Sequence, residues 1–573
     1  MIRGWGTLRD WLDADAEDRA RRERVAAAAT EWQRAGRLRD QTWFGPRLVE
    51  AQGLDEAELT ILEREFIAAS ARGVRRQVWL RRISLLGVVM LLAAAITIQR
   101  YVAKHRLADV VTTEVATAKT VLEKAHAAEL QHHELASAAY ARFDSDDAAA
   151  AEKIWAQALA ARNEAETAYR MVSGNVEAAL AKDPSRADVR AMLGSILYDR
   201  ALLAESVHEL DSRDEMISRM AAYDTGGMLR ARWARRARLE VEAPAHAEIF
   251  IEPQHLRIGV GHASVELEPG TYVVRLHAEA GPDVLDPIEL PRDGHLRLEL
   301  EMPSSLPAGF VYIPQGAFLF GSGAADDLRT SFFQTVPLHT RSTPAFLMAR
   351  DETTIAEWLD YVAAQPAADQ ARLLPNQPGK ATGSIVIAAD RDHWRIAMQP
   401  MQRVYVARWD EMLAYPGRTS HASQDWRKFP ILDISVIDAE AYAAWLDRTG
   451  RVPGARLCSE LEWEHAARGA DGRSYPSGER VADANVDVTY GRDLMGPDEV
   501  GSHPASVSPY GVNDMSGNAF EWTQSEHPGE FIAKGGSYYN DRKTANLTNR
   551  YVLAKSVRDP TLGVRVCTSQ SVK

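Results

Sequence analysis

Cysteine is the side chain whose number decides most about the chemistry open to this chain, and Cys458 and Cys567 are the only two in 573 residues. Two thiols form at most one disulfide, and they are too few for a Cys-rich zinc module, an iron–sulfur cluster or a disulfide-dense secreted scaffold. A phosphate-binding G-x-x-x-x-G-K-[ST] loop is absent from the sequence, and no G-x-S-x-G lies in a nucleophile-elbow context. The residues therefore indicate neither a nucleotide site nor a serine hydrolase.

Oxygen ligands are grouped in the segment YGVNDMSGNAFEW at 510–522. Asp514 and Glu521 supply carboxylates, and the backbone carbonyls of Gly517 and Ala519 lie between them in an expected tight turn. Hard oxygen ligands of this kind suit Ca²⁺. An ordinary Asx turn followed by a capping glutamate would use the same residues, so both interpretations stay open.

The spacing of the histidines does not predict a metal site. His132, His133 and Glu134 are adjacent, but neighbouring residues on a helix point about 100° apart, and no second ligand cluster accompanies them. We therefore expect a solvated helix face. His465 and His503 stand alone, and we expect them on the surface or as hydrogen-bonded core residues.

The uncharged segment ISLLGVVMLLAAAITI at 83–98 is a candidate membrane span. Sixteen helical residues rise about 24 Å, less than the roughly 30 Å hydrocarbon core, so the flanks must contribute. Trp79 and Tyr101 are placed for the two interfaces, and Arg81 and Arg82 can extend toward water. A buried core helix is the alternative, since apolar runs of this length are ambiguous.

Basic residues predict the orientation of this span. Five arginines precede it and three basic residues follow, so the positive-inside rule places the N-terminus in the cytoplasm. The run lies too far from Met1 for a typical cleaved signal peptide, so we expect a single-pass anchor in the inner (cytoplasmic) membrane. The C-terminal part would be periplasmic or extracellular. The formal charge of −13 argues against a nucleic-acid partner.

Composition and periodicity divide the chain into five parts. Ala, Arg, Glu and Leu with i, i+3, i+4 spacing predict helices before and after the span, with a turn at Asp183-Pro184-Ser185. From Leu239 apolar and polar residues alternate, and Glu268-Pro269-Gly270 predicts a turn between strands. We expect a helical cytoplasmic segment, a transmembrane helix, a helical region, a small β-sandwich and a C-terminal domain, at 1–82, 83–99, 100–238, 239–303 and 304–573.

Three parts outside the C-terminal domain resemble known modules. Phrases such as LTILEREFIAASARGVRR in 1–82 resemble the pre-membrane region of bacterial STAND-type NTPases. The helices around LAKDPSRADVRAMLGSILYDRALLAE resemble a tetratricopeptide pair, and ELEPGTYVVRL resembles PEGA-type β-modules. None of these resemblances carries a catalytic residue.

The C-terminal domain carries an ordered set of unusual phrases: GFVYIPQGAFLFGS, PILDISVIDAEAYAAWL, RLCSELEWEHAARGADG, YGVNDMSGNAFEW, KGGSYYNDR and TLGVRV. This set resembles the sulfatase-modifying factor, or formylglycine-generating enzyme, family. The resemblance implies a loop-rich α+β fold like that of C-type lectins. Local patterns agree: Ser459 and Glu462 predict a capping box at a helix starting near Glu460, and Gly535-Gly536 allows positive φ or close backbone approach.

The resemblance also implies site residues. It matches Asp514, Gly517, Ala519 and Glu521 to a structural Ca²⁺ site, and it suggests a second site formed by Asn485, Val486 and Asp493. It implies a disulfide between Cys458 and Cys567. Two separately buried thiols remain the alternative.

Copper is not expected. Family oxidases hold Cu(I) through two cysteines about five residues apart, because soft thiolates suit that ion. The equivalent stretch SYYNDRKTANLTNRYVLAKSVRDPTLGVRV contains no cysteine, and the ungapped positions fall near Ala545 and Arg550. A second branch of the family resembles ergothioneine-type sulfoxide synthases, whose helical iron ligands we do not find in residues 100–239.

The sequence therefore favours a membrane-anchored, noncatalytic sensor or binding protein. It would bind a peptide, glycan or protein outside the cytoplasm and act through a cytoplasmic signalling partner, in an architecture that resembles bacterial transmembrane kinases ending in this domain. An oxidase or metal-dependent oxygenase acting on a protein or small thiol, and a structural envelope protein, are the alternatives. The expected ligand cleft is formed by Tyr538, Tyr539, Asn540, Arg542, Asn546, Asn549 and Arg550.

Overall fold

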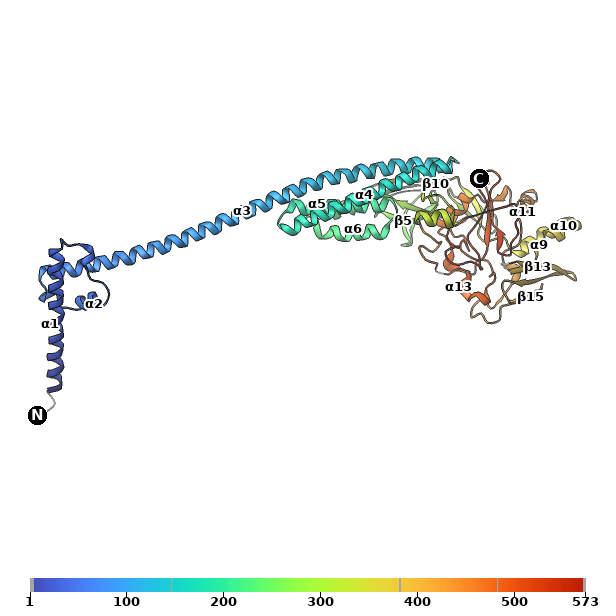
Figure 1. Cartoon of the computed structure of the whole chain (residues 1–573). Coiled ribbons are helices and arrows are strands. Elements are labelled where there is room, and N and C mark those ends of the chain that lie inside the picture. The colour runs from blue at the N-terminus through green and yellow to red at the C-terminus, as the bar shows by residue number, and fades with distance from the viewer. Residues whose placement is uncertain (1–4, 146, 381–382, 482, 570–573) are drawn as a thin grey trace. The chain divides into compact units, whose positions relative to one another are not determined.

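The computed structural model describes residues 5–145, 147–380, 383–481 and 483–569. The chain forms two compact units, Met1–Thr113 and Glu114–Lys573. Figure 1 labels their helices and strands in chain order, from blue to red. A helical N-terminal region with two long helices precedes an α+β domain at the C-terminus.

The first unit is helical, as its composition predicts. It contains α1 (Trp5–Arg34), α2 (Pro46–Gln52) and the start of α3 (Ile61–Phe143). Phe66 packs against the rings of Trp32 and Trp43, with centroid distances of 5.7 and 5.4 Å. These aromatic contacts hold the helices together, because burial of large rings supplies most of the stabilisation in so small a core.

Helix α3 is continuous for 83 residues. No proline interrupts it in the sequence, so nothing in the chain breaks its hydrogen bonding. The expected boundaries at residues 82 and 99 therefore fall inside one helix. The side chains of the apolar segment 83–98 are exposed, and this helix is long and apolar enough to cross a membrane.

The second unit begins with an alanine-rich helical bundle. The predicted turn at 183–185 separates α4 from α5. The Asp183 carboxylate accepts a hydrogen bond from the Ser185 amide at 3.1 Å. His132 corrects one expectation: it is buried against α4, where its Nδ1 lies 3.0 Å from the Ala158 carbonyl oxygen, while His133 is exposed. After α3 the helices are α4 (Ala148–Lys182), α5 (Ala187–Ser206), α6 (Leu210–Tyr223) and α7 (Met228–Trp233).

Seven strands follow in one hydrogen-bonded sheet of order β6-β5-β2-β3-β4-β1-β7. A single pair, Val260 with His262, joins β3 to β4. Inward-facing apolar side chains from both halves, Leu239 and Ile249 among them, belong to one core cluster. The strands are β1 (Ala237–Glu242), β2 (Glu248–Glu252), β3 (Leu256–Val260), β4 (His262–Leu267), β5 (Gly270–His277), β6 (Val284–Leu290) and β7 (His295–Glu299).

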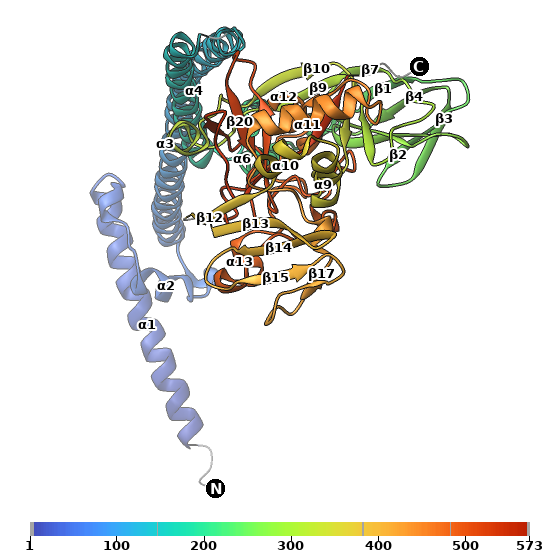
Figure 2. The same ribbon diagram turned by 90° about the vertical axis from the view of Figure 1, so that its right-hand side faces the viewer.

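The C-terminal domain has short strands and helices joined by long loops. One four-stranded sheet has the order β18-β23-β11-β8, and a second has the order β21-β20-β19-β22. Strands β12 to β15 form a third sheet, in which β13, β14 and β15 lie side by side (Figure 2). The strands are β8 (Phe310–Ile313), β9 (Gly316–Phe320), β10 (His339–Thr343), β11 (Phe346–Ala349), β12 (Asn376–Lys380), β13 (Gly383–Asp390), β14 (His393–Gln399), β15 (Tyr405–Arg408), β16 (Leu413–Ala414), β17 (Ser423–Gln424), β18 (Ala455–Leu457), β19 (Phe520–Gln524), β20 (Phe531–Lys534), β21 (Tyr551–Leu553), β22 (Leu562–Val564) and β23 (Val566–Thr568).

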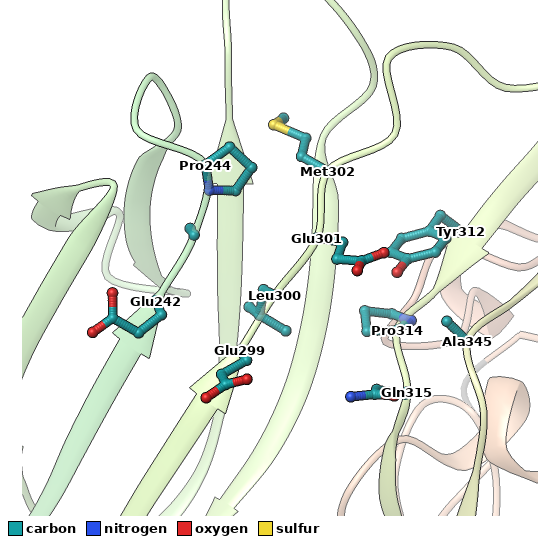
Figure 3. Close-up of a pocket in the computed structure, with 11 residues that line it drawn as sticks. Glu242, Pro244, Glu299, Leu300, Glu301, Met302, Tyr312, Pro314, Gln315 and Ala345 are labelled. Atoms are coloured by element: carbon teal, nitrogen blue, oxygen red, sulfur yellow. The ribbon is translucent and has the colours of Figure 1, made fainter. Parts of the chain in front are cut away.

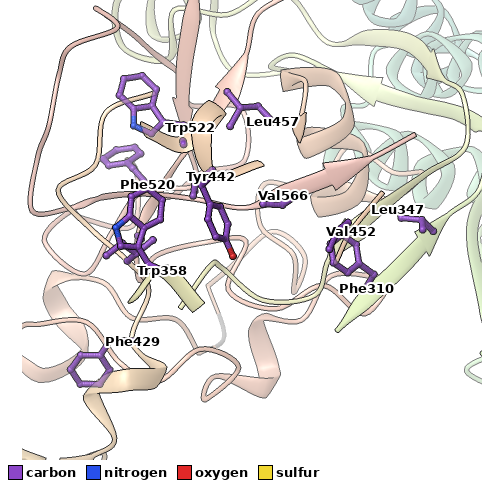
Figure 4. Close-up of a cluster of buried hydrophobic side chains, with 14 of the residues drawn as sticks. Phe310, Leu347, Trp358, Phe429, Tyr442, Val452, Leu457, Phe520, Trp522 and Val566 are labelled. Atoms are coloured by element: carbon purple, nitrogen blue, oxygen red, sulfur yellow. The ribbon is translucent and has the colours of Figure 1, made fainter. Parts of the chain in front are cut away.

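Three helices of this domain begin with complete capping boxes, which satisfy amide groups that the helix leaves unpaired. They are α9, α11 and α12, and the Ser459–Glu462 box of α12 is the one that the sequence predicts. Trp358 of α9, Tyr442 of α11 and Trp522 of β19 belong to the main apolar core (Figure 4), whereas Trp463 of α12 packs in a separate cluster. The helices are α8 (Asp326–Leu328), α9 (Ile355–Ala363), α10 (Ala367–Leu373), α11 (Val436–Arg448), α12 (Glu460–Arg468) and α13 (Asp487–Tyr490).

The helical bundle contacts the C-terminal domain through charged and aromatic groups. Arg329, only 1% exposed, donates to both carboxylate oxygens of Glu152 at 2.9 and 2.7 Å. Tyr140 stacks on His339 with ring centroids 4.8 Å apart. Because these partners come from α3, α4 and the domain, they fix the domain onto the bundle within the second unit.

Candidate functional site

Cys458 and Cys567 form a disulfide, with their Cα atoms 4.9 Å apart. Cys458 follows β18 and precedes the capping residue of α12, whereas Cys567 lies in β23. Strands β18 and β23 are antiparallel neighbours, which brings the two residues together. The pairing is the one that the family resemblance implies, and it leaves no free thiol in the chain.

The loop expected to bind calcium is buried and tightly turned. Asp514 and Asn518 adopt positive φ angles of 54° and 59°, and Gly517 has φ of 90°. A Cβ atom at Gly517 would lie 2.4 Å from the Asn485 carbonyl oxygen, so only glycine fits there. The turn therefore depends on close contact with the segment that contains Asn485.

The structure brings Asp514 and Glu521 into one buried carboxylate cluster with Glu352. The Asp514 carboxylate accepts from the Gly501 amide at 2.6 Å, and Glu352 accepts from Asn518 and from the Ala519 amide at 2.7 and 3.0 Å. Burial, together with the nearby Asp514 and Glu521 charges, raises the pKa of Glu352 well above its usual range. Burial also raises the pKa of Asp514 to about 6.

Glu521 is the member of this cluster that already has a strong partner. Arg565 donates to it at 2.7 Å and the Trp463 indole donates at 2.7 Å. Arg565 thus faces three carboxylates, and although the His503 charge also acts on Asp514, the carboxylates outnumber the cations, a difference that a bound cation or shared protons can relieve. Within the described ranges, no three His, Cys, Asp or Glu side chains are arranged to chelate a metal, so Ca²⁺ would also need the carbonyl oxygens of Gly517 and Ala519.

The second implied calcium site is not assembled as the resemblance suggests. Asn485 and Val486 are buried, and the Asn485 amide donates to the Gly496 carbonyl at 2.9 Å and to Asn518 at 3.2 Å. Its Oδ1 has no hydrogen-bond partner. Asp493, in contrast, is exposed in a separate helical turn at Arg492–Leu494.

Two of the seven residues expected in a ligand cleft do not face an open surface. Tyr538 is buried and donates its hydroxyl to the Pro560 carbonyl at 3.2 Å. Asn549 is buried and donates to the Thr544 carbonyl at 2.8 Å. Both side chains instead hold the loop that follows the two glycines.

The other five residues are at least partly accessible, but most of them, Tyr539 beside the Arg492 guanidinium included, have contacts within the chain. Arg550 donates to Glu460 at 2.9 Å, Asn546 accepts from the Thr548 amide at 3.0 Å, and Asn540 accepts from the Ser537 hydroxyl at 2.5 Å. Arg542 is exposed and Tyr539 is half-buried. Arg542, at the tip of this loop, is the one exposed residue of the seven.

The glycines before this loop have the role that their sequence predicts. Gly535 and Gly536 have φ angles of 93° and 73°. A Cβ atom at Gly536 would lie 2.7 Å from the Cα atom of Ala545. The two backbone segments can pack this closely only without a side chain at Gly536.

Residues 300–570 match the family model of the sulfatase-modifying factor enzyme 1-like domain. The formylglycine-generating enzyme of Mycobacterium tuberculosis is 30% identical over 239 residues, which are 38% of this chain and 73% of that protein. The chain belongs to the sulfatase-modifying factor family.

Other relatives of this sulfatase-modifying factor domain differ in what their names say of activity. Hercynine oxygenase of Mycolicibacterium smegmatis is 29% identical over 255 residues, 41% of this chain and 50% of that protein. The chain thus spans half the length of that relative. Inactive C-alpha-formylglycine-generating enzyme 2 of Mus musculus is 26% identical over 255 residues, 40% of this chain and 72% of that protein.

Sequence reasoning missed a buried ionic cluster around Arg418. Arg418 donates to Asp498 at 2.6 Å, and neither side chain has exposed surface. The Arg418 guanidinium lies 3.5 and 3.9 Å from the ring centroids of Tyr415 and Tyr490. No short spacing connects these residues, so only the fold reveals the cluster.

His503 belongs to the same cluster and is a hydrogen-bonded core residue. Its ring nitrogens lie 2.9 Å from Asp483 and 3.0 Å from Asp498. Burial opposes its positive charge, but the bonds to these two carboxylates prevail and raise its pKa to about 9. His465 is the opposite case: burial lowers its pKa to about 3, so it is a neutral core residue that contacts Thr343 and Tyr510.

Proposed function

We propose that this chain is a membrane-anchored binding protein whose sulfatase-modifying factor domain recognises a ligand outside the cytoplasm without copper oxidation. The observation that carries the proposal is the Cys458–Cys567 disulfide, because it uses both thiols of the chain. Cu(I) requires soft ligands, and the residues at the ungapped ligand positions, Ala545 and Arg550, supply none. One relative is named as an inactive formylglycine-generating enzyme, which supports a noncatalytic role for a domain of this family.

Ala545 and Arg550 have structural roles instead of copper ligation. Ala545 is buried in contact with Gly536. Arg550 forms a bidentate pair with Glu460, at 2.9 and 3.1 Å, which ties the loop to α12. A guanidinium has no lone pair to donate, so Arg550 cannot serve as a metal ligand.

The test of the noncatalytic proposal uses the full chain in a nonionic detergent, loaded with Cu(I). A cysteine-containing sulfatase peptide is incubated with it, and conversion to formylglycine is followed by mass spectrometry. The M. tuberculosis relative is the positive control. We expect neither conversion nor tight copper binding; conversion near the rate of the control would overturn the proposal.

Ligand recognition is assigned to the accessible tip of the loop after the glycines. Tyr539 and Arg542 offer an aromatic face and a guanidinium, which suit polar recognition of a peptide or glycan. The double variant Tyr539→Ala/Arg542→Ala should lose binding to peptides or glycans selected on arrays, whereas the exposed control Arg451→Ala should keep it. Equal binding by both variants would move the site elsewhere.

The anchor and its orientation are part of the proposal. Support comes from the exposed apolar side chains of residues 83–98 and from the basic residues before them. Because both native cysteines are bonded, an engineered cysteine is the only thiol available for labelling. An impermeant maleimide on intact cells should label Asp211→Cys and spare Glu23→Cys, and the reverse pattern would invert the orientation.

Calcium remains part of the proposal as a structural ion at Asp514. The excess of carboxylates around Arg565, in the cluster with Glu352 and Glu521, supports it. Carboxylate and carbonyl oxygens are the ligands that Ca²⁺ prefers. Such an ion would hold the turn on the Asn485 segment and take no part in catalysis.

A further inference from the structure

A cavity of about 660 Å³ lies where the seven-stranded β-unit meets the C-terminal domain (Figure 3). This volume is in the range of small-molecule sites. One wall comes from the ends of β1 and β7 and the segments that follow them; the other comes from β8, the turn between β8 and β9, and the residue before β11. It shares no residue with the loop at 538–550.

The charges in the cavity wall have one sign. Three glutamates line it, Glu242, Glu299 and Glu301, and the lining residues, all within the described part of the chain, include no Lys, Arg or His. Glu242 has His262 at 3.0 Å and Glu299 has Arg297 at 3.6 Å, but both pairs are solvent-exposed. Exposed pairs of this kind contribute little, so the wall stays electronegative.

The sheet register makes this electronegativity unusual. Strands β1 and β7 are parallel neighbours, and Glu240 lies opposite Arg297, which is a favourable pairing of charges. One step further along, at the cavity, Glu242 lies opposite Glu299. Like charges directly opposite each other destabilise a sheet. A cation bound beside these two glutamates would reduce their electrostatic repulsion.

Tyr312 is an independent sign of a ligand. It is only 5% exposed and lines the cavity, and no described residue forms a hydrogen bond with its hydroxyl. Figure 3 shows Glu301 and the Tyr312 side chain directed toward one another. Burial, with the charges of Glu301 and Asp286, raises the pKa of Tyr312 to about 12. The phenol therefore stays neutral, and it can accept a hydrogen bond from an ammonium group.

The rest of the lining is apolar. Leu300, Met302, Pro244 and Pro314 cover the space between the polar groups. A bare metal ion would gain nothing from these side chains, whereas a methylene chain would be removed from water against them. The combination of carboxylates at two places with apolar surface between them matches a cation that carries two ammonium groups on an aliphatic chain.

We propose that this cavity binds a small aliphatic diamine, with one ammonium group at Glu301 and Tyr312 and the other at the Glu242–Glu299 pair. This cavity is separate from the proposed recognition loop at 538–550. The diamine proposal does not depend on what that loop binds. It joins the β-unit to the C-terminal domain, so a bound diamine would hold the two together.

Isothermal titration calorimetry on the full chain in nonionic detergent tests the proposal, with 1,4-diaminobutane as the probe. We expect one saturable site per chain, weakened by added salt. Butane-1,4-diol, which has the same carbon chain without charge, should not bind, and n-butylamine should bind more weakly. Equal binding of the diol, equal binding of Mg²⁺, or no binding of the diamine would overturn the proposal.

Variants locate the site. Glu299→Gln/Glu301→Gln should weaken diamine binding by about tenfold or more, since two ionic contacts are lost. Tyr312→Phe removes only a hydroxyl and should weaken binding by about threefold. The control is Glu266→Gln, an exposed residue of the same sheet outside the cavity. Unchanged affinity in the double glutamine variant would refute the assignment even if the wild-type chain binds the diamine.

Discussion

Asp286 makes the stability of the second unit depend on pH. It lies in β6, is 5% exposed, and its carboxyl forms no hydrogen bond with a described residue. Burial raises its pKa from 3.8 to about 7. The folded state therefore binds a proton that the unfolded state has lost between these two values.

The sign and size follow from this difference. Because the folded-state pKa is raised, the folded chain is favoured below about pH 4, and this advantage is lost as pH rises toward 7. A shift of about three pKa units corresponds to at most about 4 kcal/mol. Asp286→Asn removes the titration, so its free energy of unfolding should exceed that of the wild type by a margin that grows by about 2–4 kcal/mol between pH 4 and 8.

Urea unfolding of the full chain in detergent, followed by tryptophan fluorescence, measures this margin, since Trp358, Trp463 and Trp522 are fully buried. The exposed Asp392→Asn is the matched control and should follow the wild-type profile. Parallel pH profiles for Asp286→Asn and the wild type would refute the reasoning, because they would mean that Asp286 titrates alike in the folded and unfolded chain.

Three further predictions concern the C-terminal domain. Reducing Cys458–Cys567, which are 109 positions apart, should lower the free energy of unfolding by about 5 kcal/mol in the loop-entropy model, and a loss under about 1 kcal/mol in urea titration would contradict it. The raised pKa of His503, about 9, adds stability below pH 6.5 that is lost as pH rises through 9, so His503→Gln should flatten the unfolding profile in that window; an unchanged slope would argue against a charged imidazole. Ca²⁺ should raise the melting temperature of the wild type but not of Asp514→Ala, and equal shifts in both would place the ion elsewhere.

Local rules predicted the parts of this fold that local interactions decide. The Ser459–Glu462 capping box and the turn at 183–185 depend on residues two or three positions apart, and Gly536 packs against Ala545 nine positions further along. Alternation of apolar residues likewise indicated strands after Leu239. In these cases the interacting residues belong to one short segment of the sequence.

Contacts between distant segments could not be predicted in this way. His132 seemed solvated because its partner, the Ala158 carbonyl, lies on the next helix. Tyr538 and Asn549 seemed free for a ligand because the surrounding composition is that of a recognition loop, yet the backbone carbonyls of Pro560 and Thr544 take up their donors. The Glu242–Glu299 pair needed the register of a parallel strand pair, which residue spacing does not indicate.

The position of β23 sets the order in which the C-terminal domain can be completed. This is the last strand that the structure describes, yet it lies between β18 and β11 in the centre of a sheet, and Cys567 within it carries the disulfide. During synthesis β8 and β11 can pair with each other, but β18 emerges before the central strand that joins it to them. This four-stranded sheet therefore cannot be completed until β23 has been synthesised.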